Sequence, residues 1–488
     1  MALSDFELHP DRLATSDERG RRVFLYPADV KGFYRKQRVR LQAVLIVFFL
    51  ALPWFRIHGC QALLLDISQQ RFEIFGLSLR AHNAPILFFV FAAMAFGLFF
   101  VTAAYGRVWC GWACPQTVFI DGVFRRIERW VEGSALERRK LHSGPLTFRG
   151  FRLRLIKWTL YIFATLVITH SFLAYFVGTD QLANMMRHSP LENWGSFLFM
   201  AISSATILFD FAWFREQFCT VLCPYGRFQS VLMDRQSLVV TYDKTRGEPR
   251  ATPQAKALSK AHGSQLGDCV NCYRCVQVCP TGIDIRRGMQ MECIACTSCI
   301  DACDDVMTKL KKPTGLIRND SLLPRASKKA RLNYRAGFYL LLFVGAITAL
   351  VFALALIKPV DIELLRAKDI PYTTQMLPEG TVMVVNHFKL ELSNESESEH
   401  KLMFSLLRKA EDPQGGEIVD PELQLITAAQ PLPIAVGKVT QTDIFIRFRK
   451  ALLVNGQKRI RLVTQDTNTK TGQMINIEKE VNLVGPFQ

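Results

Sequence analysis

Five long apolar stretches divide the first three quarters of the chain into membrane-spanning and connecting segments. A helix that crosses a bilayer needs about 20 mostly apolar residues. The first stretch is the shortest, and the fourth carries Asp210. The pattern predicts a multi-domain membrane protein with a five-helix transmembrane bundle. The five stretches are 41–57, 85–105, 155–178, 195–214 and 336–357.

After residue 358 the hydrophobic period changes from long blocks to short alternating runs. The clearest runs are 381–392, 401–407, 441–449 and 459–464, and polar turns separate them. Alternation of apolar and polar residues is typical of strands with one buried face. We therefore expect an all-β sandwich over 361–488. No catalytic constellation stands out in it, so we expect it to contact a partner or to cover the outer face.

Lysine and arginine alternate between the connecting segments. Segment 1–40 holds nine of them, 57–84 holds two, 106–154 holds ten and 179–194 holds one. Positive loops stay in the cytoplasm. This predicts a cytoplasmic segment 1–40, a cytoplasmic domain in the long 215–335 connection and a C-terminal domain on the outer side of the membrane.

The same loop charge explains the net charge of +17. No basic and aromatic residues interleave as a nucleic-acid surface requires, so we expect membrane lipid and no nucleic-acid partner. Residues 1–36 lack the apolar core of a secretion signal. We expect no cleaved signal peptide.

A duplicated cysteine motif marks an internal repeat within 41–235. Cys110-Gly-Trp-Ala-Cys114-Pro follows the second stretch, and Cys219-Thr-Val-Leu-Cys223-Pro follows the fourth at an offset of 109 residues. Two copies of a two-helix unit with the same topology are predicted. A pseudo-two-fold axis along the membrane normal would then bring the two motifs together.

Eight cysteines within 236–335 form two ferredoxin runs, and the first ends in Pro280 while the second has Asp304 at that place. Two-residue gaps let a loop wrap three corners of a 4Fe–4S cubane, and the fourth cysteine of each run reaches the other cluster. A zinc site shares the CxxC spacing, but it needs four ligands and not two such sets. The predicted first cluster is held by Cys269, Cys272, Cys275 and Cys303, and the second by Cys293, Cys296, Cys299 and Cys279.

The CxxxCP pairs allow three interpretations. Cysteines at i and i+4 share one face of a helix, and the proline that follows indicates a helix end or a kink. Four thiolates could converge on one soft metal ion, because thiolates favour Cu(I), zinc and iron–sulfur centres. A redox dithiol pair is the second interpretation. Four buried thiols that only pack at a helix interface are the third.

Weaker candidates lie in the outer loops and in the apolar stretches. Met and His suit copper, but a solvated loop is the more ordinary interpretation of the loop residues. Polar groups within membrane spans often serve function. Cys60 is isolated and is expected to pack. The loop and span candidates are His58, His82, Met185, Met186, His188, His170 and Asp210.

Taken together, these features resemble the cytochrome c oxidase accessory proteins of the CcoG/FixG/RdxA type, which are membrane ferredoxin-like assembly factors for cbb3-type oxidase. The resemblance covers nearly the whole chain. It implies a location in the bacterial inner membrane, an inserted two-cluster ferredoxin-like domain and a periplasmic C-terminal immunoglobulin-like domain. Besides the cysteine motifs, it rests on Leu-Tyr-Pro at 25–27, Val-Lys-Gly at 30–32, Leu-Pro-Trp at 52–54 and Ile-Phe-Gly at 74–76.

The resemblance also implies an activity. The family is similar to cupric reductases, which convert Cu(II) to Cu(I) before delivery to the oxidase. Copper would then be substrate or ligand, and the implied partners are the oxidase assembly machinery and copper chaperones or transporters, with a homodimer possible. The catalytic and copper-binding candidates are Cys110, Cys114, Cys219 and Cys223.

Two other functions remain open. A membrane quinol dehydrogenase shares the spans, the CxxxCP motifs and the ferredoxin runs, although the C-terminal β domain argues against it. A non-enzymatic assembly scaffold would use its clusters to sense redox state or to aid folding.

Overall fold

The computed structural model divides into two compact units, Met1–Ala353 and Leu354–Gln488. Each unit is described by itself. The structure describes all residues except 1–14, 17–18, 20, 58–59, 68–70, 81–83, 146, 235, 253–265, 322–333, 357–359, 368–369, 377, 379–380, 395–398, 410–416, 420–422, 436–438, 467–475 and 487–488.

Five helical segments are long and apolar enough to cross a membrane, and each overlaps one predicted stretch. Four continue without interruption as α1, α2, α7 and α15, and the fourth segment combines α9 with a π-helical turn at Asp210–Phe214. The presence of the five spans agrees with the sequence. Their bounds are α1 Phe33–Ala51 with a short turn to Trp54, α2 Ala84–Tyr105, α7 Phe148–Val177, α9 Trp194–Phe209 and α15 Tyr334–Ala355.

The first helix begins at Phe33, eight residues before the apolar stretch begins at 41. Arg38 lies in this polar extension and is nearly completely buried. Its guanidinium donates to the Gly111 carbonyl at 2.8 Å and forms an ion pair with Asp121. The sequence placed the start too late because these partners are distant along the chain.

Between α1 and α2 the chain forms small sheets that hydrophobicity alone did not predict. Strands β1 Arg56–Ile57 and β2 Cys60–Gln61 pair with each other, and three further strands form an antiparallel meander. Gln61 ties this region to α7, because its amide nitrogen donates to the Ala174 carbonyl at 3.0 Å. The meander consists of β3 Leu63–Asp66, β4 Arg71–Ile74 and β5 Leu77–Arg80.

Short helices connect the spans. Each CxxxCP motif lies at a break between two of these short helical segments. Cys114 has extended backbone and immediately precedes α4, and Cys223 stands in the same way before α10. The predicted helix break at the second cysteine is therefore confirmed in both copies. The connecting helices are α3 Val108–Trp112, α4 Pro115–Phe119, a π-helical turn Ile120–Phe124, α5 Arg125–Glu132, α6 Ala135–Ser143, α8 Thr179–Arg187, a π-helical turn Phe218–Leu222 and α10 Pro224–Leu232.

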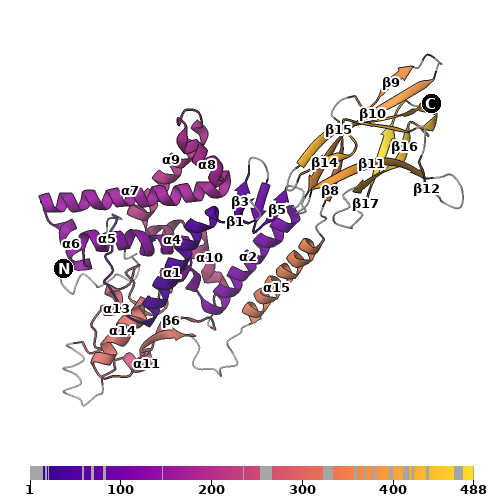
Figure 1. Ribbon diagram of the computed structural model, residues 1–488. Coiled ribbons are helices and arrows are strands. Elements are labelled where there is room, and N and C mark those ends of the chain that lie inside the picture. The colour runs from indigo at the N-terminus through magenta and orange to yellow at the C-terminus, as the bar shows by residue number, and fades with distance from the viewer. Residues whose placement is uncertain are drawn as a thin grey trace. The chain divides into compact units, whose positions relative to one another are not determined.

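The cysteine-rich segment folds around a two-stranded sheet. Strand β6 Val239–Tyr242 pairs antiparallel with β7 Ile317–Asp320. Between them lie α11 Lys244–Gly247, α13 Arg274–Gln277 and α14 Ser298–Lys309. Figure 1 shows these elements together near the start of α1.

The extended segment before α1 joins the cysteine-rich part to the helices. The Ala28 amide donates to the Gln277 carbonyl at 2.8 Å, and Arg274 donates to the Asp29 carbonyl at 3.0 Å. The same segment also contacts the helices, because the Arg22 guanidinium donates to the Phe214 carbonyl at 3.0 Å. The N-terminal segment is therefore built into the first unit.

The second unit contains two five-stranded antiparallel sheets, in agreement with the predicted β domain (Figure 1). One sheet has the order β13-β15-β10-β8 with β9 beside β10, and the other has β12-β11-β16-β17 with β14 beside β11. Their bounds are β8 Val360–Arg366, β9 Thr373–Met376, β10 Val382–Asn394, β11 His400–Lys409, β12 Glu417–Val419, β13 Gln424–Thr427, β14 Leu432–Ile434, β15 Val439–Arg449, β16 Gln457–Asp466 and β17 Asn476–Val484.

Alternate side chains of the strands bury one apolar core in this unit. On β10, Phe388, Leu390 and Leu392 belong to the apolar core, as the two-residue period requires. Asn386 is also fully buried, and its amide exchanges two hydrogen bonds of 2.8 Å with the backbone of Val484. A buried amide is tolerated there because both of its groups are paired.

Replacing the fully buried Phe448 by alanine should lower the free energy of unfolding of the C-terminal unit by about 3–5 kcal/mol, because it leaves a cavity. The matched control is Phe445→Ala on the same strand. Phe445 is 36% exposed and stacks on His387, so its loss should cost about 1.5 kcal/mol at most. Urea unfolding of the 354–488 fragment measures both. Equal losses would contradict the assigned inward face of β15.

Candidate iron–sulfur and thiol site

The eight ferredoxin cysteines line two neighbouring cavities, and they divide between the cavities as a crossed pattern requires. Cys303, from the end of the second run, joins the first three cysteines of the first run. Cys279, from the end of the first run, joins the first three of the second. Cys275 touches both cavities. The first cluster site is lined by Cys269, Cys272, Cys275 and Cys303, and the second by Cys293, Cys296, Cys299 and Cys279.

The two runs wrap their cavities with the same backbone geometry. In the first run Asn271 and Tyr273 have left-handed φ values of 56° and 55°. In the second, Ala295 and Thr297 have 51° and 61° at the corresponding places. This conformation is uncommon for residues with a Cβ atom. Its repetition in both runs indicates that each loop is shaped to surround a bound group.

The chemistry of the donor set fits iron–sulfur clusters. Each cavity holds the four thiols of one predicted cluster among mainly apolar neighbours, such as Ile283 and Ile285 around the second and Met307 and Leu316 around the first. Burial raises the pKa of Cys293 and of Cys303 to about 12. Thiolates in such surroundings require metal to remain ionised, so the residues present fit the group.

The two CxxxCP motifs also come together, although 109 residues separate them. The side-chain amide of Gln229, on α10 after the second motif, donates to the Cys110 sulfur at 3.0 Å. Both motifs carry the same backbone bond, because the amides of Cys114 and Cys223 each donate across a π-type turn at 2.8 Å. We name the group of Cys110, Cys114, Cys219 and Cys223 the thiol site.

Burial and the charges of neighbouring thiols affect the ionisation of three of these thiols. Burial is the main cause that raises the pKa of Cys110 to about 11; the Gln229 hydrogen bond opposes this effect, and the charges of Cys114 and Cys223 add to it. Burial also raises the pKa of Cys114 and of Cys219, and the other three thiols add to the effect on Cys219. Cys110, Cys114 and Cys219 are therefore favoured as neutral thiols until a cation compensates the charge of the thiolates.

The thiol site lies directly against the loop of the second cluster site. Gly111 packs on that loop, and a Cβ atom placed on it would overlap the Ile294 carbonyl and come within 2.9 Å of the Cys296 amide. The backbone next to Cys110 therefore contacts the backbone that carries Cys296. The contact needs a residue without a side chain at position 111.

Arg107, in the first copy of the repeat, contacts both the second copy and the second cluster loop. It is buried, and its guanidinium donates to the Met291 carbonyl in the second cluster loop and to the Gly226 carbonyl on α10. Its charge also lowers the pKa of Cys293, against the larger effect of burial. One cation thus connects the first copy of the repeat, the second copy and the second cluster site.

Other candidate metal ligands are not brought together. Within the described part of the chain, no three His, Cys, Asp or Glu side chains converge closely enough to hold a single metal ion. The common ligation of one ion by the four thiols stays a prediction.

The loop and span candidates have local partners or lie outside the described residues. His188 bonds to the Asn184 carbonyl at 2.8 Å, and His170 bonds to the Leu166 carbonyl of its own helix at 2.7 Å. Met186 is 67% exposed, and Met185 precedes it at the end of α8. The side chains left outside the described residues are His58, His82 and Cys60.

Asp210 is the exception among these candidates, because it lies beside the thiol site. It accepts a hydrogen bond of 2.9 Å from Gln116, which follows the first CxxxCP motif. Its charge also contributes to the raised pKa of Cys219. Gln116 therefore links the end of the fourth span to the first motif.

The sequence did not single out Arg107, Gly111 or Gln229. Arg107 is one of ten cations in its segment, and no local pattern separates it from the others. The repeat offers one signal, because the position 109 residues later is Glu216. Opposite charges at equivalent positions indicate that the two copies make different contacts.

Three family models match the chain. A 4Fe-4S dicluster domain matches residues 214–322, which contain both ferredoxin runs. A 4Fe-4S binding domain matches 87–134, which contains the first CxxxCP motif. A domain described as the IG-like fold at the C-terminal of FixG matches 350–486.

Curated relatives match over most of the chain. It is 32% identical to Protein RdxA of Cereibacter sphaeroides over 400 residues, which cover 79% of this chain and 82% of that protein. It is 33% identical to Protein RdxB of the same organism, with 81% and 84% covered. Nitrogen fixation protein FixG of Rhizobium meliloti is 37% identical, with 64% and 60% covered. The chain belongs to the FixG/RdxA family and is a membrane iron–sulfur electron-transport protein of that class.

Proposed function

We propose that this protein reduces Cu(II) to Cu(I) at the thiol site, with electrons that arrive through the two clusters. The observation that carries the proposal is the packing of Gly111 on the second cluster loop, beside Cys110. An electron on the second cluster would reach the thiol site across this contact. The Cu(I) product would supply the assembly of a cbb3-type oxidase.

The proposal assigns the ligands in the crossed pattern. Cys269, Cys272, Cys275 and Cys303 hold the first cluster, and Cys293, Cys296, Cys299 and Cys279 hold the second. The division of these residues between the two cavities supports the assignment. When bound, each cluster takes up and gives up one electron at a time.

The thiol site supplies soft ligands for the copper ion. Thiolates favour Cu(I) over hard cations, so they bind the product more tightly than water does. Two of the four thiolates would capture the ion first. The hydrogen bond from Gln229 keeps the Cys110 sulfur oriented.

The reaction balances with one electron. Cu(II) gains one electron and becomes Cu(I), and one reduced cluster loses it. A thiol that binds the ion releases its proton, and Asp210, which acts on Cys219, lies beside the site as an acceptor. The proposal requires a reductant that supplies one electron to the clusters for each copper ion reduced.

Two alternatives make different demands on the same residues. A quinol dehydrogenase would need a quinone pocket near a cluster, and the C-terminal β unit adds nothing to that activity. A scaffold would need the clusters only for folding or redox sensing. The proposed partners of the cupric reductase are copper chaperones or transporters and the oxidase assembly machinery, with the C-terminal unit as a docking domain and a homodimer possible.

Anaerobic single-turnover mixing should separate the three functions. Protein with reduced clusters is mixed with Cu(II) or with a quinone analogue, and cluster absorbance is followed. We expect oxidation by Cu(II), together with the appearance of Cu(I) bound by a chelating dye. If only the quinone oxidises the clusters, the dehydrogenase is correct. If neither reagent does, both enzymatic functions fail and the scaffold remains.

Replacing Cys110 by alanine should lower copper binding and Cu(I) production while both clusters keep their EPR signals, because this thiol belongs to the thiol site. Copper analysis and EPR of the same anaerobic sample measure both effects. The control is Cys60→Ala, which removes a thiol outside the four motifs. Loss of a cluster in the Cys110 variant would show that the two sites are not separate.

Gly111→Ala should slow oxidation of the clusters by Cu(II) roughly tenfold or more, because the added methyl group pushes the second cluster loop away from the thiol site. Gly337→Ala is the matched control, since a Cβ atom there meets no other atom within 4 Å. Stopped-flow absorbance gives both rates. An unchanged rate in the Gly111 variant would contradict a path through this contact.

Paired cysteine variants test the crossed ligands. In the crossed pattern, Cys269→Ser and Cys303→Ser damage the same cluster, so the double variant should keep half of the wild-type iron. Cys293→Ser with Cys303→Ser damages both clusters and should lose nearly all of it. Iron analysis after anaerobic reconstitution gives the answer. If the two double variants exchange these results, each run binds its own cluster.

A further inference from the structure

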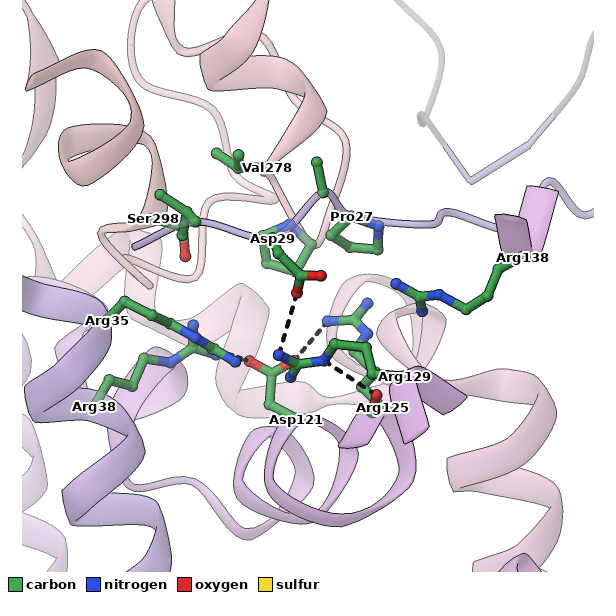
Figure 2. A pocket seen from close by; sticks show the side chains of 13 residues that line it. Pro27, Asp29, Arg35, Arg38, Asp121, Arg125, Arg129, Arg138, Val278 and Ser298 are labelled. Carbon is green, nitrogen blue, oxygen red and sulfur yellow. Dashed lines mark hydrogen bonds and ion pairs between the residues drawn. The ribbon is translucent and has the colours of Figure 1, made fainter. Parts of the chain in front are cut away.

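A cavity lies where the extended segment before α1, the start of α1 and helices α5 and α6 meet the cysteine-rich part (Figure 2). Its volume is about 40 Å³, whereas a single water molecule needs roughly 10–15 Å³. The cavity is therefore large enough for a small polyatomic ion. Guanidinium groups dominate its wall, from Arg35, Arg38, Arg125, Arg129 and Arg138.

One group of ion pairs in this wall has a surplus of positive charge. Arg35 and Arg38 both pair with Asp121, at 3.6 Å for Arg35. Arg125 pairs with the same carboxylate at 2.8 Å and also with Glu216. Three guanidiniums thus share two carboxylates. The pKa of Asp121 is lowered despite its burial, since these cations surround it.

A second group repeats the surplus. Arg138 pairs with Glu128 at 2.9 Å, and Arg215 pairs with the same carboxylate. Arg129 balances Asp29 at 3.1 Å at the cavity edge. Over both groups, and among the residues that the structure describes, six guanidiniums are paired with four carboxylates, which leaves two positive charges uncompensated. Arg215, Glu128 and Glu216 belong to these ion pairs but do not line the cavity.

Two of the arginines also keep a buried donor without a partner. The Nε atoms of Arg125 and Arg138 are both buried and unpaired among the described atoms. The Arg138 side chain is only 2% exposed, and Figure 2 shows it pointing from α6 toward the side of the cavity that Pro27 and Asp29 form. An unpaired buried donor is unfavourable, so both arginines keep hydrogen-bonding capacity that the described residues leave unused.

We propose that this cavity binds a phosphate group. Inorganic phosphate carries up to two negative charges, which equal the surplus, and the phosphodiester of a lipid headgroup carries one. The several oxygens of either group suit the planar, multi-donor guanidinium groups. A chloride ion or a single carboxylate would satisfy fewer of these donors. The phosphate comes from free inorganic phosphate or from the headgroup of an anionic phospholipid, because Arg35 and Arg38 lie at the start of a membrane span.

The bound phosphate would lie near the second cluster site. Pro280 and Ser298 line the cavity, and they are adjacent in the chain to Cys279 and Cys299. Negative charge close to a cluster disfavours its reduction. Occupation of the cavity should therefore lower the reduction potential of the second cluster more than that of the first.

The test is equilibrium dialysis of the delipidated full-length protein against radiolabelled inorganic phosphate. Wild type should bind one phosphate per chain. Arg129→Gln should weaken binding on the order of tenfold or more, because it removes a charged donor from the cavity edge. Arg129 is 28% exposed, so the substitution leaves no fully buried carboxylate unpaired. Unchanged EPR signals of both clusters confirm that the variant is folded.

Arg126→Gln is the matched control, because it removes the same charge from the same helix but does not line the cavity. It should bind phosphate as wild type does. Absence of phosphate binding to wild type, or equal weakening by both substitutions, would overturn the proposal.

Nanodiscs distinguish the two sources of phosphate. If the site takes a lipid headgroup, discs that contain phosphatidylglycerol should abolish the Arg129-dependent uptake of free phosphate, whereas discs of phosphatidylcholine should not. If it takes free phosphate, uptake should be equal in both kinds of disc.

Discussion

The contact of Arg107 with the Met291 and Gly226 carbonyls is the interaction on which the account of the site depends. These two hydrogen bonds connect the cysteine-rich part to both copies of the membrane repeat. Removal of a buried charged donor leaves its acceptors without a partner and costs more than the average hydrogen bond contributes. The relative position of cluster loop and thiol site is therefore fixed by a few polar contacts and by the absence of a side chain at Gly111.

The two copies of the internal repeat share a backbone conformation but make different contacts. Both copies break a helix at the second cysteine and form the same π-type hydrogen bond there. Their charges differ at equivalent positions, since Arg107 reaches the cluster loop whereas Glu216 pairs with Arg125. The first copy thus faces the second cluster site, and the second copy closes the ion pairs around Asp121. Duplication provides four thiols, and divergence places the first copy, through Arg107, against the second cluster loop.

The sequence predicted the features that local pattern determines. Five apolar stretches, the alternating strands of the second unit and the helix breaks at Cys114 and Cys223 agree with the structure. It placed the start of α1 too late and missed the β3–β5 meander. The physical reason is range, because Arg38 finds Asp121 83 residues away. Arg107 and Gln229 were invisible for the same reason, since neither belongs to a motif.

We propose that the second cluster, and not the first, is coupled to the thiol site through Arg107. The most direct measurement is an EPR-monitored redox titration of both clusters in wild type and in Arg107→Gln, with the signals assigned by Cys293→Ser. A cation close to a cluster raises its reduction potential. The account predicts that the potential of the second cluster falls in the variant while that of the first is unchanged. A shift of the first cluster alone, or no shift of either, would contradict it.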